Sequence, residues 1–313
     1  MNGFLKKQSP RTSIAGYNIK WFVARLKMNR EFSSFVLVEG DTDTKYYGRF
    51  INIDTCRITA ACKNRENVER TIKACNEAKV RGVIGIADAD MDRLAGTLDE
   101  TIENLFYTDT ADLETQIIDR EIFEGLIWEK ADPYKCRQLE KSEGITLYDY
   151  ITVLCRRLSV LYYLNSKYHL GLHLKDEERR LARWFGDGLS FDWDGLLDYL
   201  IKNRGNQEIT DEEIAKYQAD AEEIFAKNDS ILRGHSFTSL IAAILSRPEI
   251  AREDEDIFYA DDSHQSKKRV EKWFVESMLR MCTPKFLQTE LCQKIRDWQK
   301  ANPGHQILKP EYS

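Results

Sequence analysis

Acidic residues follow two apolar runs of the sequence at the point where each run stops. The acids are Glu39 and Asp43 after the run at 35–38, and Asp88 and Asp90 after the run at 83–87. Continuous runs rich in Val and Ile predict strands that are buried on both faces of a parallel sheet. Because ligands bind at the carboxyl edge of such sheets, we expect these acids to converge there.

Converging carboxylates require a positive charge between them. Two carboxylates roughly 4 Å apart repel each other by about 4 kcal/mol at an effective dielectric near 20. Neither stretch offers His or Cys, and oxygen ligands alone favour Mg²⁺, with Mn²⁺ as a substitute, over zinc. Since Mg²⁺ keeps several waters and accepts phosphate oxygens, the pattern indicates phosphoryl-transfer chemistry on a nucleic acid or nucleotide.

The same residues carry a resemblance to a known family. Val38-Glu39-Gly40 with Asp43, followed by Asp88-Ala-Asp90, resembles the Toprim domain of topoisomerases, bacterial primases and nucleases of the OLD type. Within that group the chain is most similar to the stand-alone AriB-type nucleases, the effectors of PARIS anti-phage systems. The resemblance covers residues 33–118 well and the rest loosely. It implies that Glu39, Asp88 and Asp90 hold a divalent metal and that Asp43 is the second acid of the first motif.

A further acidic motif of this family resembles Asp112-Leu-Glu114. Asp109 and Thr110 precede it and predict the N-cap of a helix. Asp112 and Glu114 lie two residues apart and cannot both face the same way on that helix. We therefore expect Glu114 to bind the metal or a neighbouring ligand, the alternative being first-turn acids that the helix dipole favours.

Three basic residues are candidates for substrate contacts. Lys63 and Arg65 follow a predicted strand at the active edge and can bind phosphate, although loop cations are often only solvated. His235, in Arg233-Gly-His, resembles a Gly-His element of the same nuclease branch. It can contact phosphate or act as a general acid near neutral pH, the alternative being a capping or packing histidine.

The elements that must position these residues change character along the chain. Helical spacing of apolar residues predicts helices over 17–29, 42–50 and 63–79. Short apolar or alternating runs predict strands over 55–60, 82–87 and 104–107. Further helices are predicted over 148–164, 176–184, 193–203, 211–226, 237–245, 267–281 and 284–300. The expected fold is α/β, a mostly parallel sheet flanked by helices, followed by an all-α C-terminal region. The expected domains are a basic arm and helix over 1–32, a Toprim domain over 33–120 and a helical domain over 121–313.

Composition places the chain among ordinary water-soluble proteins, with 42% hydrophobic and 31% charged residues. It has no apolar run long enough to span a membrane and no secretory signal, so we expect a cytoplasmic protein without membrane contact. Seven scattered cysteines without a Cys-x-x-Cys pair argue against structural zinc and for a reducing compartment. Residues 1–30 contain Lys6, Lys7 and Arg11 and no acid, so they form an arm that binds phosphate or an acidic partner, or is only solvated.

These expectations give two hypotheses of different classes. The first is a Mg²⁺-dependent endonuclease that hydrolyses RNA such as tRNA, or DNA. The resemblance further implies a toxic defence effector that an ATPase partner protein holds, and the helical half has enough apolar surface for a homodimer. The second is a catalytically silent Toprim-like scaffold that binds a partner protein or a nucleotide. No motif reads a 2′-hydroxyl, so RNA and DNA both remain open.

Overall fold

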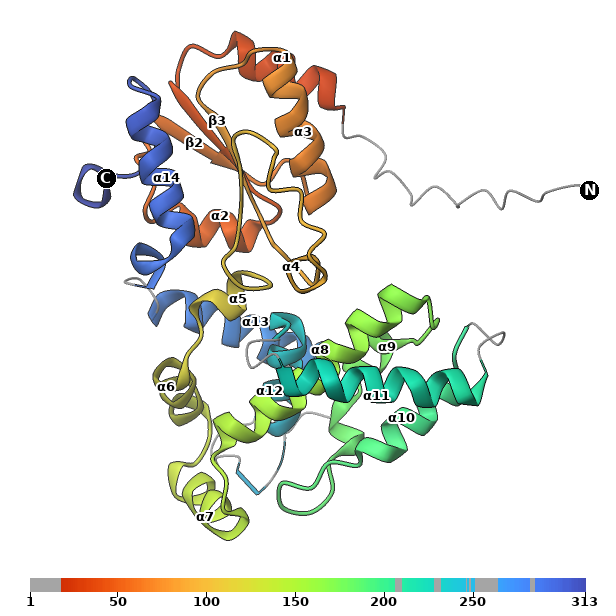
Figure 1. Ribbon diagram of the computed structural model, residues 1–313. Coiled ribbons are helices and arrows are strands. Elements are labelled where there is room, and N and C mark those ends of the chain that lie inside the picture. The colour runs from red at the N-terminus through yellow and green to blue at the C-terminus, as the bar shows by residue number, and fades with distance from the viewer. Residues whose placement is uncertain are drawn as a thin grey trace, which may run out of the picture. The chain divides into compact units, whose positions relative to one another are not determined.

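The computed structural model describes two compact units (Figure 1). It describes residues 18–205, 210–227, 232–245, 247, 249–250, 264–281 and 285–313, with only the backbone at 211, 218, 225 and 264–271. Unit 1 comprises the described residues up to Ala87, together with Asp99–Tyr107 and Gln293–Ser313. Unit 2 comprises Asp88–Leu98 and the described part of Thr108–Cys292. The predicted arm around Lys6 and Arg11 lies outside the described residues.

Unit 1 is built around a four-stranded sheet in which every pair of neighbouring strands is parallel. Its strands are β1 (Ser34–Leu37), β2 (Cys56–Thr59), β3 (Val83–Ala87) and β4 (Leu105–Tyr107). The strand order is β2-β1-β3-β4, so β1 and β3 are the central pair, with Leu37 opposite Gly85. All residues of β1 and β3 are buried, as the uninterrupted apolar runs predict. The predicted α/β class with a parallel sheet is confirmed.

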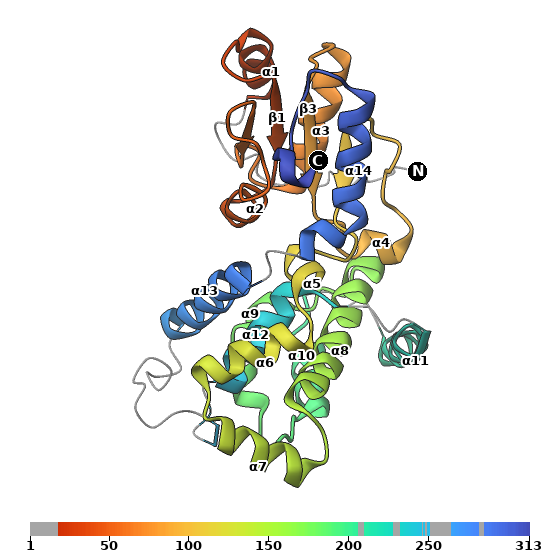
Figure 2. The same cartoon turned by 90° about the vertical axis from the view of Figure 1, so that its left-hand side faces the viewer.

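Helices cover both faces of this sheet, with α3 on one side and α14 on the other (Figures 1 and 2). The helices of unit 1 are α1 (Ile19–Met28), α2 (Asp41–Tyr47), α3 (Arg65–Glu77) and most of α14 (Glu290–Ala301). Helix α3 packs so closely on β3 that a side chain at Gly85 would meet Val68 and Ile72 within 3.0 Å. A small residue is therefore required in the middle of an otherwise Val/Ile-rich strand.

The C-terminal segment belongs to the sheet unit. Leu308 forms an antiparallel bridge with Ile51, and the N–H of Lys309 donates to the Phe50 carbonyl at 2.8 Å. The indole N–H of Trp298 donates to Asn104, which precedes β4, at 2.7 Å. The bounds of the two units thus differ from the sequence-based division at residues 120 and 121.

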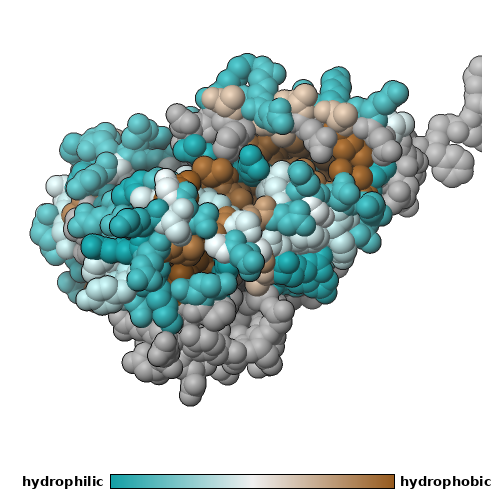
Figure 3. Space-filling model, turned by 90° about the horizontal axis from the view of Figure 1, so that it is seen from below, coloured by the Kyte–Doolittle hydropathy of each residue, from teal (hydrophilic) through white to brown (hydrophobic). Residues whose placement is uncertain are grey.

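Unit 2 contains helices and no strand among its described residues. Its helices are α4 (Asp92–Ala95), α5 (Leu113–Ile117), α6 (Arg120–Lys130), α7 (Pro133–Glu143), α8 (Leu147–Tyr168), α9 (Leu174–Glu178), α10 (Trp193–Lys202), α11 (Asp211–Lys227), α12 (Gly234–Leu245) and α13 (His264–Met281). Helix α12 is buried along nearly its whole length and packs against α8 and α13, so it is the central helix of this unit. Seen from below, hydrophobic residues show mainly in hollows between hydrophilic ones (Figure 3).

Several predicted helix bounds were wrong. The predicted helix over 176–184 is two elements, α9 and a 3₁₀ helix over Leu181–Trp184. The predicted helix over 284–300 is a 3₁₀ turn over Lys285–Gln288 followed by α14. Helices α6 and α7 were not predicted, although Asp119 and Asp132 cap them through backbone N–H groups of their first turns.

The described cysteines are free thiols buried in the protein. Six cysteines are free and buried, namely Cys56, Cys62, Cys75, Cys136, Cys155 and Cys292, while Cys282 lies outside the described residues. Burial raises the pKa of Cys56 to about 12, so this thiol behaves as a small core residue. Of the described helices, none combines the length and hydropathy that crossing a membrane requires.

Candidate functional site

The first acidic motif of unit 1 lies where β1 ends and α2 begins. Glu39 is partly buried and follows the last residue of β1 by two positions. Gly40 is the N-cap of α2, and its N–H donates to a carboxylate oxygen of Asp43 at 2.8 Å. The helix predicted over 42–50 thus begins one residue earlier, and Asp43 lies inside its first turn and bonds back to the cap.

The candidate basic residues of unit 1 differ in their partners. Lys63 is exposed and has a φ of 65°, in the left-handed region, at the turn between β2 and α3. Arg65 is the first residue of α3, and its Nε donates to Glu69 at 2.7 Å. Its guanidinium also lies 5.2 Å from the ring centroid of Tyr107. Lys63 is thus the more accessible cation of the pair.

The second acidic motif begins unit 2, directly after β3 in the chain. Asp88 is partly buried, whereas Asp90 is exposed and has a φ of 50°. Non-glycine residues rarely adopt this left-handed conformation, although Asp tolerates it better than most. Two bonds hold the turn, since the N–H of Ala89 donates to Thr108 Oγ1 at 3.0 Å and the N–H of Asp90 to the Ala111 carbonyl at 2.6 Å. The Asp88–Asp90 turn is therefore tied to the segment that leads into α5.

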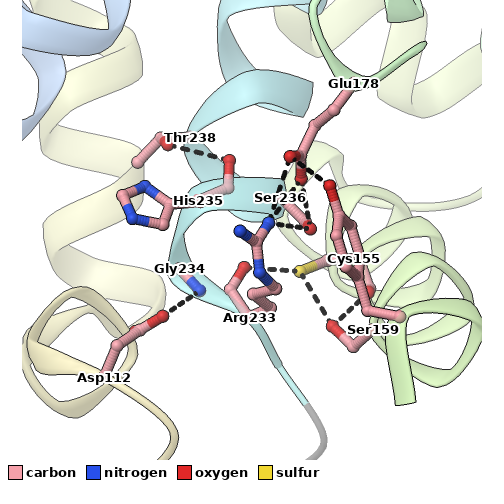
Figure 4. A network of polar contacts seen from close by, with 10 residues as sticks. Asp112, Cys155, Ser159, Glu178, Arg233, Gly234, His235, Ser236 and Thr238 are labelled. Atoms are coloured by element: carbon pink, nitrogen blue, oxygen red, sulfur yellow. Dashed lines mark hydrogen bonds and ion pairs between the residues drawn. The ribbon is translucent and has the colours of Figure 1, made fainter. Parts of the chain in front are cut away.

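Asp112 is the N-cap of α5, and it joins this helix to α12 (Figure 4). One carboxylate oxygen accepts the N–H of Thr115 at 2.9 Å, and the other accepts the N–H of Gly234 at 2.6 Å. A Cβ on Gly234 would lie 2.5 Å from this carboxylate and 2.6 Å from the Cβ of Glu114. The predicted cap at Asp109 or Thr110 was wrong, and Glu114 lies beside the first residue of α12.

Asp109 has a different and more distant role. Its two carboxylate oxygens accept the N–H groups of Glu290 at 2.7 Å and Leu291 at 2.9 Å, the first residues of α14. Asp109 therefore satisfies the start of a helix that lies at the other end of the sequence.

The backbone at the start of α12 is fixed by a buried ion pair (Figure 4). Arg233 Nη1 donates to both carboxylate oxygens of Glu178 at 2.9 and 3.1 Å, and Ser236 donates to the same carboxylate at 2.5 Å. The guanidinium lies 4.1 Å from the Tyr162 ring centroid, and the Tyr162 hydroxyl donates to Glu178 at 2.7 Å. Burial is the largest single influence on the pKa of Arg233 and lowers it, but the charge and hydrogen bond of Glu178, together with Tyr162 and Asp112, outweigh it, so the net shift is upward. The ion pair therefore fixes the position of Arg233 and, with it, the start of α12.

His235 is exposed, and its ring lies on the side of α12 away from the Arg233–Glu178 pair (Figure 4). Its carbonyl accepts the hydroxyl of Thr238 at 3.0 Å. The structure thus brings Glu114 next to the Gly234-His235 element, two features that are more than a hundred residues apart in the sequence.

The donor chemistry fits a divalent ion in one respect and not in another. Glu39, Asp43, Asp88, Asp90 and Glu114 supply only carboxylate oxygens, the ligand type that Mg²⁺ takes. Within the described part of the chain, however, no three residues of the types His, Cys, Asp or Glu form a group that could hold a metal ion. The residues fit Mg²⁺ by type, and a ready-made set of three ligands is not among the described residues.

The roles of Asp112, Glu178 and Arg233 were missed from the sequence. Asp112 precedes the helical Leu113–Ile117, which is the ordinary N-cap signal, but no local pattern indicates that Gly234 is its second partner. Glu178 and Arg233 likewise pair across a long separation. Only the fold identifies these three residues as supports of the candidate site.

Comparisons with known proteins identify no relative of this chain. No family model matches the chain, and no curated protein matches it either. The resemblance to Toprim nucleases therefore stays a prediction from the residues of the two acidic motifs.

Proposed function

We propose that the chain is a metal-dependent endonuclease of Toprim type, in the OLD-like branch, that hydrolyses phosphodiester bonds of RNA such as tRNA, or of DNA. The parallel pairing of β1 with β3 is the observation that carries this proposal. Both strands run toward the same edge, where Leu37 is two residues before Glu39 and Ala87 immediately precedes Asp88. Ligand sites of open parallel sheets lie at this edge.

Glu39, Asp88 and Asp90 would hold the metal, with Asp43 and Glu114 as further ligands or neighbours of the ligands. Bound Mg²⁺ would orient the attacking water and stabilise the leaving oxygen. Lys63 would contact a substrate phosphate, since it is exposed at the turn after β2. His235 is an exposed candidate for phosphate contact, and Arg65 would contribute only if its bond to Glu69 opened.

The proposed biological role rests on the motif resemblance alone. An AriB-type effector would be a cytoplasmic toxin that an ATPase sensor protein restrains until infection. A homodimer would supply two sites. The described helices support only the coarser statement that no membrane-spanning helix is present among them.

One observation favours a second candidate function. Since no group of three ligating residues is present within the described ranges, the chain can instead be a Toprim-like scaffold that binds a partner protein or a nucleotide without turnover. A pure scaffold, however, has no need of four acids after neighbouring strands, where their mutual repulsion costs stability.

Cleavage of mixed substrates tests the proposal. The purified protein is incubated with Mg²⁺ or Mn²⁺ and with plasmid, single-stranded DNA and total RNA. We expect metal-dependent cleavage of one class, loss of cleavage in Glu39→Ala and Asp88→Ala, and full cleavage in Asp54→Ala, which removes an exposed acid away from both motifs. A folded wild-type protein that cleaves none of these substrates would support the scaffold instead.

A further inference from the structure

A cavity of about 390 Å³ lies between α8, α10 and α11 in unit 2, and its lining includes no residue of the acidic motifs. Its mouth is lined by Arg157, Trp193, Asp194 and Glu222, and its walls include Leu161 and Leu197. A smaller recess of about 30 Å³ shares Leu161 and Leu197 and is lined almost entirely by apolar side chains. The α8–α10–α11 cavity thus has a polar entrance and an apolar interior, the usual construction of a small-molecule site.

The charged side chains at the cavity entrance determine whether a positively or a negatively charged ligand is favoured. Two carboxylates, on Asp194 and Glu222, face one guanidinium, on Arg157. Both acids are exposed, and neither has an ion pair with another described residue. The surrounding segment 187–227 contains eleven acidic and four basic residues, a net charge of −7, whereas the whole chain has −6. This segment of the sequence, which includes α10 and α11, thus has a net negative charge, and the two carboxylates at the entrance favour a cation.

The aromatic side chain at the entrance favours the same class of ligand. The Arg157 guanidinium lies 5.5 Å from the centroid of the Trp193 ring, so a cation already occupies this ring and the positive group of a ligand would replace Arg157 there. Trp is the best aromatic partner for cations, particularly for quaternary ammonium groups. The buried Val160 and Leu161 below it offer no polar partner, so the rest of the ligand must be apolar.

We propose that the α8–α10–α11 cavity binds a small organic cation with an apolar body. The positive group lies between Asp194, Glu222 and the Trp193 ring, and the apolar body extends along Leu161 and Leu197. The site is independent of the proposed nuclease chemistry, because none of its residues belongs to the acidic motifs.

A series of alkyltrimethylammonium ions tests the proposal on the whole wild-type chain by isothermal titration calorimetry. Each added methylene should strengthen binding roughly fourfold while it still enters the apolar interior. Octyltrimethylammonium, used below its micelle concentration, should therefore bind at one site at least tenfold more tightly than tetramethylammonium. Octanesulfonate, with the same chain and the opposite charge, should not bind. Equal binding of both octyl compounds, or no binding of the octyl cation, would overturn the proposal.

Matched variants assign the binding to this cavity. The double change Asp194→Asn with Glu222→Gln should weaken octyltrimethylammonium binding at least tenfold. The control Asp198→Asn with Glu223→Gln removes the same charge from the same two helices, at residues paired with Lys202 and Lys227 outside the lining. Its affinity should stay within twofold of wild type. Equal weakening in both double variants would mean a diffuse charge effect and would contradict a built site.

Discussion

Asp112 shows how one carboxylate can fix two helices. It is 5% exposed, and its two oxygens accept N–H groups from the first turn of α5 and from the first residue of α12. Both groups are among those that a helix leaves without an internal partner at its start. Because Glu114 follows Asp112 by two residues, the same contact determines where this candidate ligand lies relative to Gly234.

Asp112→Ala should therefore destabilise the protein more than the loss of an ordinary cap. Loss of an N-cap costs about 1 kcal/mol, and a buried N–H without a partner costs about 1–3 kcal/mol. The expected loss in free energy of unfolding is about 2–4 kcal/mol by urea denaturation. Asp192→Ala is the control, because Asp192 caps α10 through one N–H at an exposed site and should cost only about 1 kcal/mol. Equal losses in the two variants would show that the bond to Gly234 contributes nothing.

Asp119 should contribute to the acid sensitivity of the fold. Burial acts to raise the pKa of this carboxyl, but the N–H of Ile122 and the ammonium of Lys285 outweigh it, and the pKa is lower than its ordinary value of 3.8. A lowered folded-state pKa stabilises the protein above pH 4, and this stabilisation is lost as the pH falls through the folded-state value.

Asp119→Asn should keep the cap of α6 and flatten the fall of stability below pH 4. Its cost at pH 7 should be under about 1 kcal/mol, because the pair with Lys285 is partly exposed. The measurement is the free energy of unfolding between pH 3 and pH 7. An unchanged acid slope in the variant would refute the assigned role of Asp119.

At the scale of elements, the start of α12 depends on the Arg233–Glu178 pair. The two side chains are 17% and 9% exposed, so each charge has left most of its water. Removing one partner of a buried pair leaves an uncompensated charge, whereas replacing both with apolar residues is often nearly neutral.

Arg233→Ala should lower the free energy of unfolding by about 3–5 kcal/mol. The double change Arg233→Met with Glu178→Leu should recover part of this loss, because no buried charge is left alone, while the hydroxyls of Ser236 and Tyr162 lose their acceptor. Chemical denaturation of the three proteins gives the comparison. A double variant that is less stable than Arg233→Ala would mean that the ion pair itself is the main stabilising contact.

The sequence predicts elements well where local pattern decides them. The apolar runs identify β1 and β3 and their burial, and helical spacing identifies α3, α8 and α10 within a few residues. Local pattern fails where the partner is distant. Asp109 precedes a helix in the sequence, yet it caps α14, about 180 residues away. The sequence alone indicates the acids of the candidate site, whereas only the fold shows that Asp112 and Arg233 support them.

At the scale of the whole molecule, the last residues of the described chain belong to unit 1, the same unit as the first ones. Gln293–Ser313 belongs to the sheet unit although its helical periodicity matches that of the residues before it. Periodicity reports which face of a helix is buried but not which unit buries it. Leu308 and Ile51, 1% and 2% exposed, are part of the contact that joins the two ends of this unit.

Leu308→Ala should loosen the sheet and not the helices of unit 2. The expected cost is about 2–5 kcal/mol, because a buried leucine leaves a cavity. Hydrogen exchange should rise in β1 and β3 and stay unchanged in α8 and α12, and exposed Glu311→Ala should change neither. Faster exchange in α8 and α12 instead would favour the sequence-based division, in which 121–313 forms one domain.

Manganese titration is the most direct test of the proposal that acids after neighbouring strands share one ion. Free Mn²⁺ is measured by electron paramagnetic resonance for wild type, Glu39→Ala, Asp88→Ala and Asp54→Ala. We predict that wild type and Asp54→Ala bind equally and that both Glu39→Ala and Asp88→Ala lose at least tenfold in affinity while staying folded. Binding by Glu39→Ala that equals wild type would contradict the account, because Glu39 would then take no part in holding the ion.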